Sequence, residues 1–132
     1  MEVDKLRFKL GPYTNYGDDM KKFIKVMKAL SDPNRVKVLK MLQTRTLCVC
    51  EIQAALKIAQ STVSKHLKIL EEADLVTFEK DGLWVNYMIN SEPDNPYAKK
   101  MLELLDEWLS DDPQIIFLLE ELKDISREKI VK

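Results

Sequence analysis

Both cysteines of the chain stand together, as Cys48-Val49-Cys50 within the stretch TLCVCEIQAAL. Thiolate sulfur is a preferred ligand of soft metal and metalloid ions, so the pair is a candidate ion site. Free cysteine is also often buried as a small apolar side chain, and this alternative stays open on the residues alone. A thiol reductase is not favoured, because the sequence lacks the Cys-x-x-Cys motif and the βαβ context of those enzymes. We therefore predict that the protein is not an enzyme.

The two-residue spacing limits how the cysteines can share one ligand. Consecutive residues of an α-helix are turned by about 100°, so side chains two positions apart point away from each other. In extended backbone, side chains two positions apart share a face. Cys48 stands where a helix would be capped, and Glu51 follows three residues later, as in a capping box. We expect the pair in the first turn of a helix, where local distortion can bring both sulfurs to one ion and the helix N-terminus favours thiolate.

Helical patterns precede the cysteine pair. Apolar residues recur at helical spacing over about residues 18–30, and again over about residues 33–42. Asp32 is placed to cap the second of these helices, with Pro33 in its first turn. The chain has only three glycines, which favours a mainly helical fold with few turns that need a positive φ.

Two short helices and a hairpin follow. The first helix starts near Cys48 and the second covers about residues 60–73, with only the residues KIA between them. The apolar period then changes to that of strands over about residues 75–89, where Asp81-Gly82 marks a hairpin turn. A helix-turn-helix followed at once by a hairpin is a winged helix-turn-helix. The predicted fold class is therefore mainly α with a small β-hairpin, the wing.

Three segments make up the predicted domain organisation. Residues 1–17 form an N-terminal arm, residues 18–90 the winged helix-turn-helix DNA-binding core, and residues 91–132 the C-terminal dimerisation helices. The helices at both ends are more apolar than one small domain needs, which indicates that they form the interface of a homodimer. A two-fold dimer would present two reading helices to half-sites about one turn apart in a palindromic duplex.

The charge distribution separates the core from the C-terminal segment. Residues 20–90 carry twelve Lys and Arg against seven Asp and Glu, a net charge of +5. Residues 91–132 carry six against eleven, a net charge of −5. A basic middle beside an acidic end fits a surface for double-stranded DNA joined to a segment that stays off the DNA. Chance scatter of charge is the plainer alternative.

The first turn of the predicted reading helix carries small and amide side chains that can approach base edges and phosphates. Lys80 is the basic residue at the tip of the predicted wing and is expected to assist from there. His66 is predicted to be a structural or phosphate-contacting residue and not a metal ligand. The predicted DNA-binding residues are Gln60, Ser61, Thr62, Ser64, Lys65, His66 and Lys80.

The sequence resembles the ArsR/SmtB family of metal-responsive repressors over about residues 30–89. The matching stretches occur in the family's order and spacing: ALSDPNRVKVLKML, LCVCEIQAAL, QSTVSKHLKILEEADLV and KDGLWVNYMI. The resemblance implies a homodimeric winged-helix repressor of metal-resistance genes, which binds an operator when metal-free and leaves it when the effector binds. The Cys-Val-Cys pattern is similar to that of members that sense arsenite or antimonite, and to the branch that senses cadmium and lead.

Departures from the family's patterns bear on which ion would bind Cys48 and Cys50. Arsenic-sensing members often have a third cysteine where this chain has Gln53, so arsenic(III) would need a third ligand from outside the pair. Cadmium-type sites add cysteines from the N-terminal arm, and the arm here has none. Zinc-type sites use His and acids on the dimer helix, whereas the one histidine here lies on the reading helix. We expect arsenic(III) or antimony(III) as the effector, before cadmium, lead or zinc, and no permanent cofactor.

The sequence also bears on the compartment. It has no run of about 18 apolar residues, the length that a membrane helix needs, and its start, MEVDKLRFKL, lacks the pattern of a signal peptide. We expect a cytoplasmic protein with reduced thiols and no membrane partner. Two alternatives stay open: a redox-responsive regulator that uses the same thiols, and an interaction module that no longer binds DNA.

Overall fold

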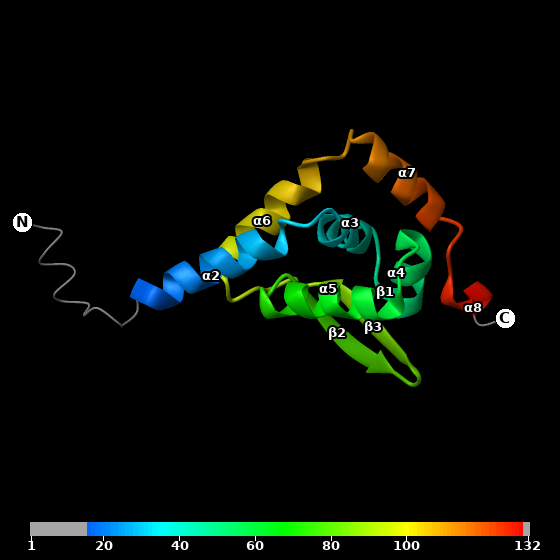
Figure 1. Ribbon diagram of the computed structural model, residues 1–132, viewed down its shortest axis with the longest axis horizontal. Helices are drawn as coiled ribbons and strands as arrows, with labels where there is room; N and C mark the ends of the chain where they lie inside the picture. The colour runs from blue at the N-terminus through cyan, green and yellow to red at the C-terminus, as the bar shows by residue number, and fades with distance from the viewer. Residues whose placement is uncertain (1–15, 131–132) are drawn as a thin grey trace, which may run out of the picture.

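The computed structural model describes residues 16–130, so nearly all of the predicted arm, residues 1–17, lies outside the described part of the chain. The helices lie to one side of a small three-stranded antiparallel sheet, and the hairpin of this sheet extends away from them (Figure 1). This confirms the predicted fold class, mainly α with a small β-hairpin. Within residues 16–130, no helix has the length and apolar character needed to cross a bilayer.

Two helices lead to the cysteine pair, α2 (Tyr16–Ala29) and α3 (Pro33–Leu42). Asp32 caps α3 as predicted, because its Oδ1 accepts hydrogen bonds from the backbone N–H of Asn34 (2.8 Å) and of Arg35 (3.2 Å). The second half of α3 is wholly buried in the core. This places the end of α3 in the core, while the chain that leaves it is exposed at residues 44–46 and becomes buried again at Leu47 and Cys48.

The predicted helix-turn-helix consists of α4 (Val49–Leu56) and α5 (Gln60–Glu72). The residues between them are Lys57-Ile58-Ala59, and Lys57 ends α4 in the left-handed conformation, with a φ of 59°. The inward face of α5 is completely buried, and it consists of Val63, Leu67 and Leu70. The apolar period in the sequence therefore predicted both the helix and the face by which it packs.

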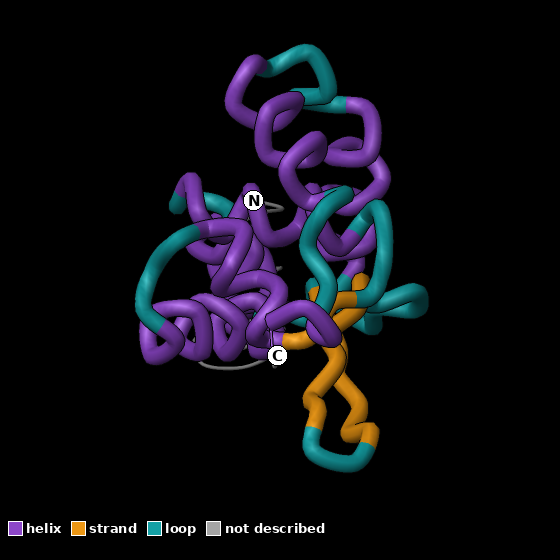
Figure 2. The backbone as a smooth tube through the Cα atoms, turned by 90° about the vertical axis from the view of Figure 1, so that its right-hand side faces the viewer, coloured by secondary structure: helices purple, strands orange, loops and turns teal. Residues whose placement is uncertain are grey.

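The wing is formed by β2 (Val76–Asp81) and β3 (Trp84–Ile89), which pair antiparallel. Asp81 is still paired with Trp84, so the turn is at Gly82-Leu83, one residue later than predicted. Gly82 has a φ of +61°, which a residue without a Cβ adopts at little cost. Figure 2 shows that the hairpin projects away from the helices, so its tip is free to meet a partner.

A third strand, β1 (Leu47–Cys48), was not predicted from the sequence. It pairs with β3 and gives the sheet the order β1-β3-β2, with Leu47 opposite Tyr87 and Cys48 opposite Asn86. Two residues are too few for an alternating pattern to be recognised in a sequence. One of the two cysteines, Cys48, is therefore part of the sheet that carries the wing.

The C-terminal segment contains α6 (Pro96–Glu107), α7 (Pro113–Leu122) and a short α8 (Arg127–Ile130) that was not predicted. Helix α6 packs against α2, whereas α7 packs against α3 and α4, and α8 packs against α4. The segment assigned to dimerisation therefore also folds back over the helix-turn-helix of its own chain, as the orange and red elements in Figure 1 show.

Lys40 holds the end of α6 on α3 from a buried position. Its Nζ donates to the backbone oxygens of Leu105 (2.7 Å) and Trp108 (2.9 Å), which belong to the last turn of α6. The side chain is 5% exposed, so these bonds replace nearly all of its hydration. A cation at a helix C-terminus also interacts favourably with the helix dipole.

We expect Lys40→Ala to lower the free energy of unfolding by about 2 to 3 kcal/mol, because two charge-assisted hydrogen bonds are lost and buried carbonyls stay unpaired. Lys68→Ala, which removes an exposed lysine from α5, is the matched control and should change it by less than about 0.5 kcal/mol. Urea denaturation followed by circular dichroism measures both. Equal effects of the two substitutions would contradict the role given to Lys40.

Candidate ion site and nucleic-acid interface

Cys48 lies at the junction between β1 and α4. Its backbone is extended, with φ −82° and ψ 165°, and it is the N-cap of α4. Its N–H donates to Glu51 Oε1 (2.9 Å), and the backbone N–H of Glu51 is directed at the thiol, so the predicted capping box is formed. The residue is 1% exposed, which makes this thiol part of the core.

Cys50 lies two residues later, inside the first turn of α4, and is partly exposed. Cys50 is close enough to Cys48 to contribute to the shift of the Cys48 pKa. The angular separation of a regular helix therefore does not apply to the pair, because Cys48 precedes the helix. The extended backbone at Cys48 meets one of the two conditions expected for a shared ligand, an extended or a distorted backbone, whereas the binding of an ion by the pair stays a prediction.

Burial raises the pKa of the Cys48 thiol to about 12. This value includes smaller upward contributions from Cys50 and from the negative charge of Glu51, and a downward contribution from the backbone N–H of Glu51. The prediction that the helix N-terminus would favour thiolate is therefore wrong for Cys48. At neutral pH this residue is a thiol, and any ion that binds it must displace its proton.

The surroundings of the pair offer no complete ligand set. Within the part of the chain that the structure describes, no cluster of three or more His, Cys, Asp and Glu side chains could hold a metal ion. Glu51 is the nearest acid in sequence, but Arg45 Nη1 (3.2 Å) and the backbone N–H of Arg127 (3.2 Å) already occupy its Oε2. The pair can supply two sulfur ligands, and a third ligand must come from outside these residues.

The predicted DNA-binding residues lie on α5 and on the wing. All but His66 are exposed, so their side chains can reach a partner. Helix α5 has no side-chain cap, because its N-cap is Ala59. The exposed residues are Gln60, Ser61, Thr62, Ser64 and Lys65 on α5 and Lys80 on the wing.

His66 faces the interior of the chain, with a side chain that is 12% exposed. Its Nδ1 lies 3.2 Å from Arg35 Nη1, and its Nε2 lies 3.9 Å from Asp32 Oδ1. Arg35 in turn donates to the backbone oxygens of Ala29 (2.8 Å) and Lys28 (3.0 Å) at the end of α2. The imidazole thus connects α5 with the α2–α3 junction, in agreement with the structural role considered for it.

Asp32 completes this group beside α5. Burial raises its pKa, but the hydrogen bonds from the backbone N–H groups of Arg35 and Asn34 and the charges of His66 and Arg35 lower it more, so the net pKa is below the ordinary value. The carboxylate therefore stays ionised at neutral pH and keeps its capping role. Sequence reasoning missed Arg35, because its partner His66 lies 31 residues away in the chain.

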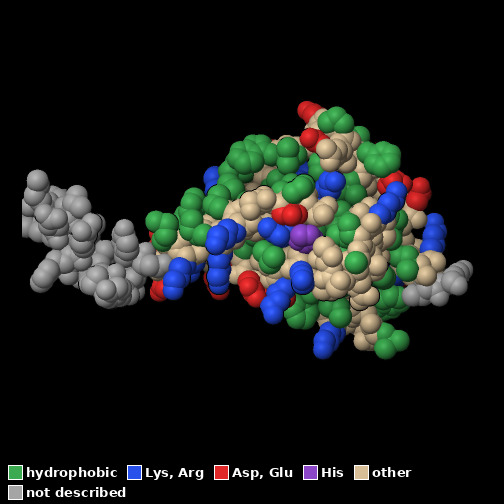
Figure 3. Space-filling view, viewed as in Figure 1, with side chains coloured by type: hydrophobic (Ala, Val, Ile, Leu, Met, Phe, Trp, Pro, Cys, Tyr) green, Lys and Arg blue, Asp and Glu red, His purple; other side chains and the backbone are tan. Residues whose placement is uncertain are grey.

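The surface around α5 carries exposed lysines together with exposed acids, among them Glu71, Glu72, Glu79 and Asp81. On the face shown in Figure 3, several Lys and Arg side chains lie along the lower side, over α2, α5 and the wing, while hydrophobic side chains lie along the upper side, over α6 and α7. Exposed lysines on α5 and the wing agree with the net positive charge of residues 20–90. This distribution suits a polyanion on the side of α5.

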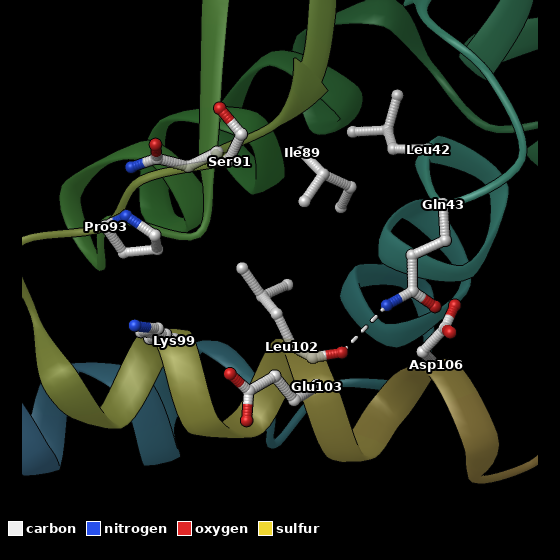
Figure 4. A pocket seen from close by; sticks show the side chains of 10 residues that line it. Leu42, Gln43, Ile89, Ser91, Pro93, Lys99, Leu102, Glu103 and Asp106 are labelled. Atoms are coloured by element: carbon white, nitrogen blue, oxygen red, sulfur yellow. Dashed lines mark hydrogen bonds between the residues drawn. The ribbon is translucent and has the colours of Figure 1, made fainter.

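A separate hollow of about 510 Å³ lies between α3, α6 and the segment after β3 (Figure 4). Gln43 donates from Nε2 to the backbone oxygen of Leu102 (3.1 Å) at its wall. Leu42, Ile89 and Leu102 give it apolar lining, and Lys99 and Glu103 are at its rim. Neither cysteine and none of the predicted DNA-binding residues line this hollow, so it is not part of either candidate site.

Comparison with known proteins places the helix-turn-helix in one family. The family model described as bacterial regulatory protein, arsR family, matches residues 32–77. An uncharacterised HTH-type transcriptional regulator of Methanocaldococcus jannaschii is 38% identical over 87 residues, which cover 65% of this chain and 93% of that protein. The arsenical resistance operon repressor of Bacillus subtilis is 36% identical over 77 residues, which cover 58% of this chain and 73% of that repressor.

A comparison with solved structures agrees with this result at the level of the fold. The homodimeric winged helix-turn-helix DNA-binding domain of a possible ArsR-family transcriptional regulator from Mycobacterium bovis superimposes with a TM-score of 0.62 and 24% sequence identity. The superposition covers 74% of this chain and 86% of that domain. The arrangement of helices, reading helix and wing described above is therefore that of a winged helix-turn-helix.

The burial of Cys48 predicts its chemical reactivity. In Cys50→Ser, where Cys48 is the remaining thiol, the rate of alkylation by iodoacetamide should rise about tenfold per pH unit from pH 7 to pH 10, without a plateau, because the thiolate is the reactive form. The same variant unfolded in urea is the control and should reach its plateau near a pKa of about 8.5. A plateau near that pH in the folded variant, measured by mass spectrometry, would show that the thiol is not buried.

Proposed function

The chain belongs to the ArsR family of bacterial regulatory proteins, and from this premise we propose that it is a transcriptional repressor relieved by a thiophilic ion at Cys48 and Cys50. The observation that supports the proposal is the position of both cysteines at the β1–α4 junction, where Cys48 caps the first helix of the helix-turn-helix and Cys50 lies in its first turn. An ion that binds both sulfurs stabilises whichever junction geometry suits it best, and thereby favours one conformation of the helix-turn-helix.

Arsenite or antimonite is the effector that this site suits best. Arsenous acid, As(OH)₃, can react with two thiols to form two As–S bonds and release two water molecules, and one hydroxide then stays on arsenic as the third ligand. Each thiol proton leaves within a water molecule, so a protonated, buried Cys48 is a suitable reactant. Cadmium and lead ions arrive without a hydroxide to accept these protons, and the described residues give them no further ligands. The arsenical resistance repressor among the relatives supports the same choice.

DNA contact is assigned to the exposed first half of α5 and to the wing. Side chains from Gln60 to Lys65 would meet base edges and phosphates in the major groove, and Lys80 would meet the backbone beside it. His66, which faces Arg35 and Asp32, would act by positioning α5. A palindromic operator of double-stranded DNA would follow from a two-fold dimer.

A homodimer is supported by apolar side chains that the single chain leaves exposed. Met20, Phe23 and Ile24 lie exposed on α2, and Trp108 and Leu109 lie exposed after α6. Helices α2 and α6 pack against each other, so these residues belong to neighbouring elements. A second copy of the chain would cover apolar area of this kind.

A redox-responsive version of the same regulator is opposed by the state of Cys48. Cysteines that sense oxidants are accessible and have a lowered pKa, because the thiolate is the form that reacts. Cys48 is buried and has a raised pKa. Oxidation is therefore an outcome to be tested beside ion binding, and it is not proposed as the function.

The role of the pair is tested by Cys48→Ser and Cys50→Ser. Both variants should bind the DNA upstream of the protein's own gene as the wild type does, and neither should release it with arsenite, because a hydroxyl is a poor ligand for arsenic(III). Fluorescence anisotropy measures the affinity with and without arsenite, antimonite, cadmium, lead and zinc.

A cysteine variant that keeps the full response to arsenite would place the effector site elsewhere. Release of the wild type by mild oxidation, with no response to any ion, would identify the redox regulator instead.

The DNA interface is tested by Lys65→Ala. The substitution should weaken binding to all duplexes and reduce the slope of log K against log salt by about 1 for each protomer, because one phosphate contact is lost. Lys100→Ala, an exposed lysine on α6, is the matched control and should leave the slope unchanged. A wild-type protein without a salt-dependent slope would be an interaction module and not a DNA-binding regulator.

A further inference from the structure

The C-terminal segment reaches the cysteine junction and the wing through one residue, Arg127. Its backbone N–H donates to Glu51 Oε2 (3.2 Å), on the carboxylate whose other oxygen accepts from the Cys48 N–H. Its guanidinium donates to Asn86 Oδ1 (3.3 Å) on β3 and to Asp81 Oδ2 (3.4 Å) at the end of β2. Arg127 therefore contacts the cap of α4 and both strands of the wing.

Trp84 is a third residue of the wing that contacts Arg127. The guanidinium carbon of Arg127 lies over the ring of Trp84, 4.9 Å from the ring centre. A cation at this distance from an aromatic face is attracted to it. Trp84 is the first residue of β3, directly after the turn, so the contact holds the end of the hairpin that projects from the molecule.

Arg45 binds the same oxygen of Glu51 as Arg127 does, and it also binds the C-terminal segment. Its Nη1 lies 3.2 Å from Glu51 Oε2, and its Nη2 donates to the backbone oxygens of Leu122 (3.3 Å) and Ile125 (2.7 Å). The end of α7 and the loop before α8 are thus tied to the buried carboxylate. Between these groups lies a polar hollow of about 290 Å³, lined by Arg45, Glu51, Asn86 and Arg127 among others.

Sheet pairing brings Cys48 into the same group. Cys48 on β1 is opposite Asn86 on β3, and Asn86 is the residue whose side chain Arg127 binds. A displacement of Cys48 therefore acts on two partners of Arg127, through the cap bond to Glu51 and through the pairing with Asn86. The guanidinium contacts with the wing are long and partly exposed, and such contacts are individually weak. A small movement is enough to loosen them.

We propose that Arg127 is a positioning residue that holds the wing in the orientation set by the cysteine junction and transmits ion binding at that junction to the wing. The inference rests on the proposed function, since the ion is the one assigned there to Cys48 and Cys50. Arg127 lies outside residues 32–77, which the family model matches, so family membership alone does not supply this contact.

The link to the wing is tested first without ion or DNA. The chain has two tryptophans, so Trp108→Phe leaves Trp84 as the only one. In this background, Arg127→Ala should make Trp84 fluorescence more easily quenched by acrylamide, and Arg127→Lys, which keeps the charge, should restore part of the protection. Lys123→Ala removes a positive charge from the same segment without touching the wing and should change nothing. Unchanged quenching in Arg127→Ala would overturn the proposal.

Transmission is tested with the DNA upstream of the protein's own gene. The readout is the ratio of DNA affinities without and with arsenite, and mutation of one member of a coupling network typically changes such a ratio by about twofold to thirtyfold. We expect Arg127→Ala to lower the ratio by this factor while two thiols per chain are still titrated by arsenite. Lys123→Ala should keep the wild-type ratio.

The outcomes separate this inference from the proposed function. If Arg127→Ala weakens DNA binding by the same factor with and without arsenite, the residue has only an electrostatic or structural role and the inference fails. If the wild type binds DNA but is not released by arsenite, the proposed function fails, and the quenching of Trp84 alone then decides whether Arg127 positions the wing. Thermal unfolding of each variant identifies any that fail to fold.

Discussion

The backbone of Cys48 is held from two directions at once, and the arrangement of the candidate site depends on this. On one side, its N–H is bound by the Glu51 carboxylate that closes the first turn of α4. On the other, it is paired with Asn86 in the sheet that carries the wing. Because Cys48 is both the last residue of β1 and the N-cap of α4, it cannot move without acting on both elements. The thiol at this position is therefore connected by the backbone itself to α4, the first helix of the helix-turn-helix, and to the sheet that carries the wing.

Glu51 is the polar group on which this junction depends. Its carboxylate is almost completely buried, and a buried charge is tolerated only when its oxygens are paired. Cys48 and Arg45 provide two of its partners, and the backbone of Arg127 provides a third. Because these donors come from three separate parts of the chain, one buried acid joins the cysteine loop, the end of α3 and the C-terminal segment. The sheet and α7 then close around it.

Much of the fold was predictable because the capping residues and the apolar periods in the sequence agree with the observed helix ends and buried faces. Asp32 with Pro33 marks the start of α3, and Cys48 with Glu51 marks the cap of α4, as the hydrogen bonds confirm. The two-residue strand β1 and the four-residue helix α8 were not predictable, because neither is long enough to have a period. The state of Cys48 was predicted wrongly, because a helix N-terminus is visible in a sequence but burial against the sheet is not. The contacts of His66 with Arg35 and Asp32 were not predicted either, because these two residues are distant from His66 in the chain.

Under the proposed function, the unequal exposure of the two thiols sets an order of events for the ion that they would chelate. Cys50 is partly open to solvent and Cys48 is not, so an incoming ion meets Cys50 first. The second sulfur–ion bond then forms within the molecule, where the neighbouring thiol has a high effective concentration and no second encounter is needed. Departure runs in reverse, and the buried bond must break before the exposed one can let the ion go. Such a pair captures an ion at the rate of an open cysteine and retains it for the lifetime of a closed one.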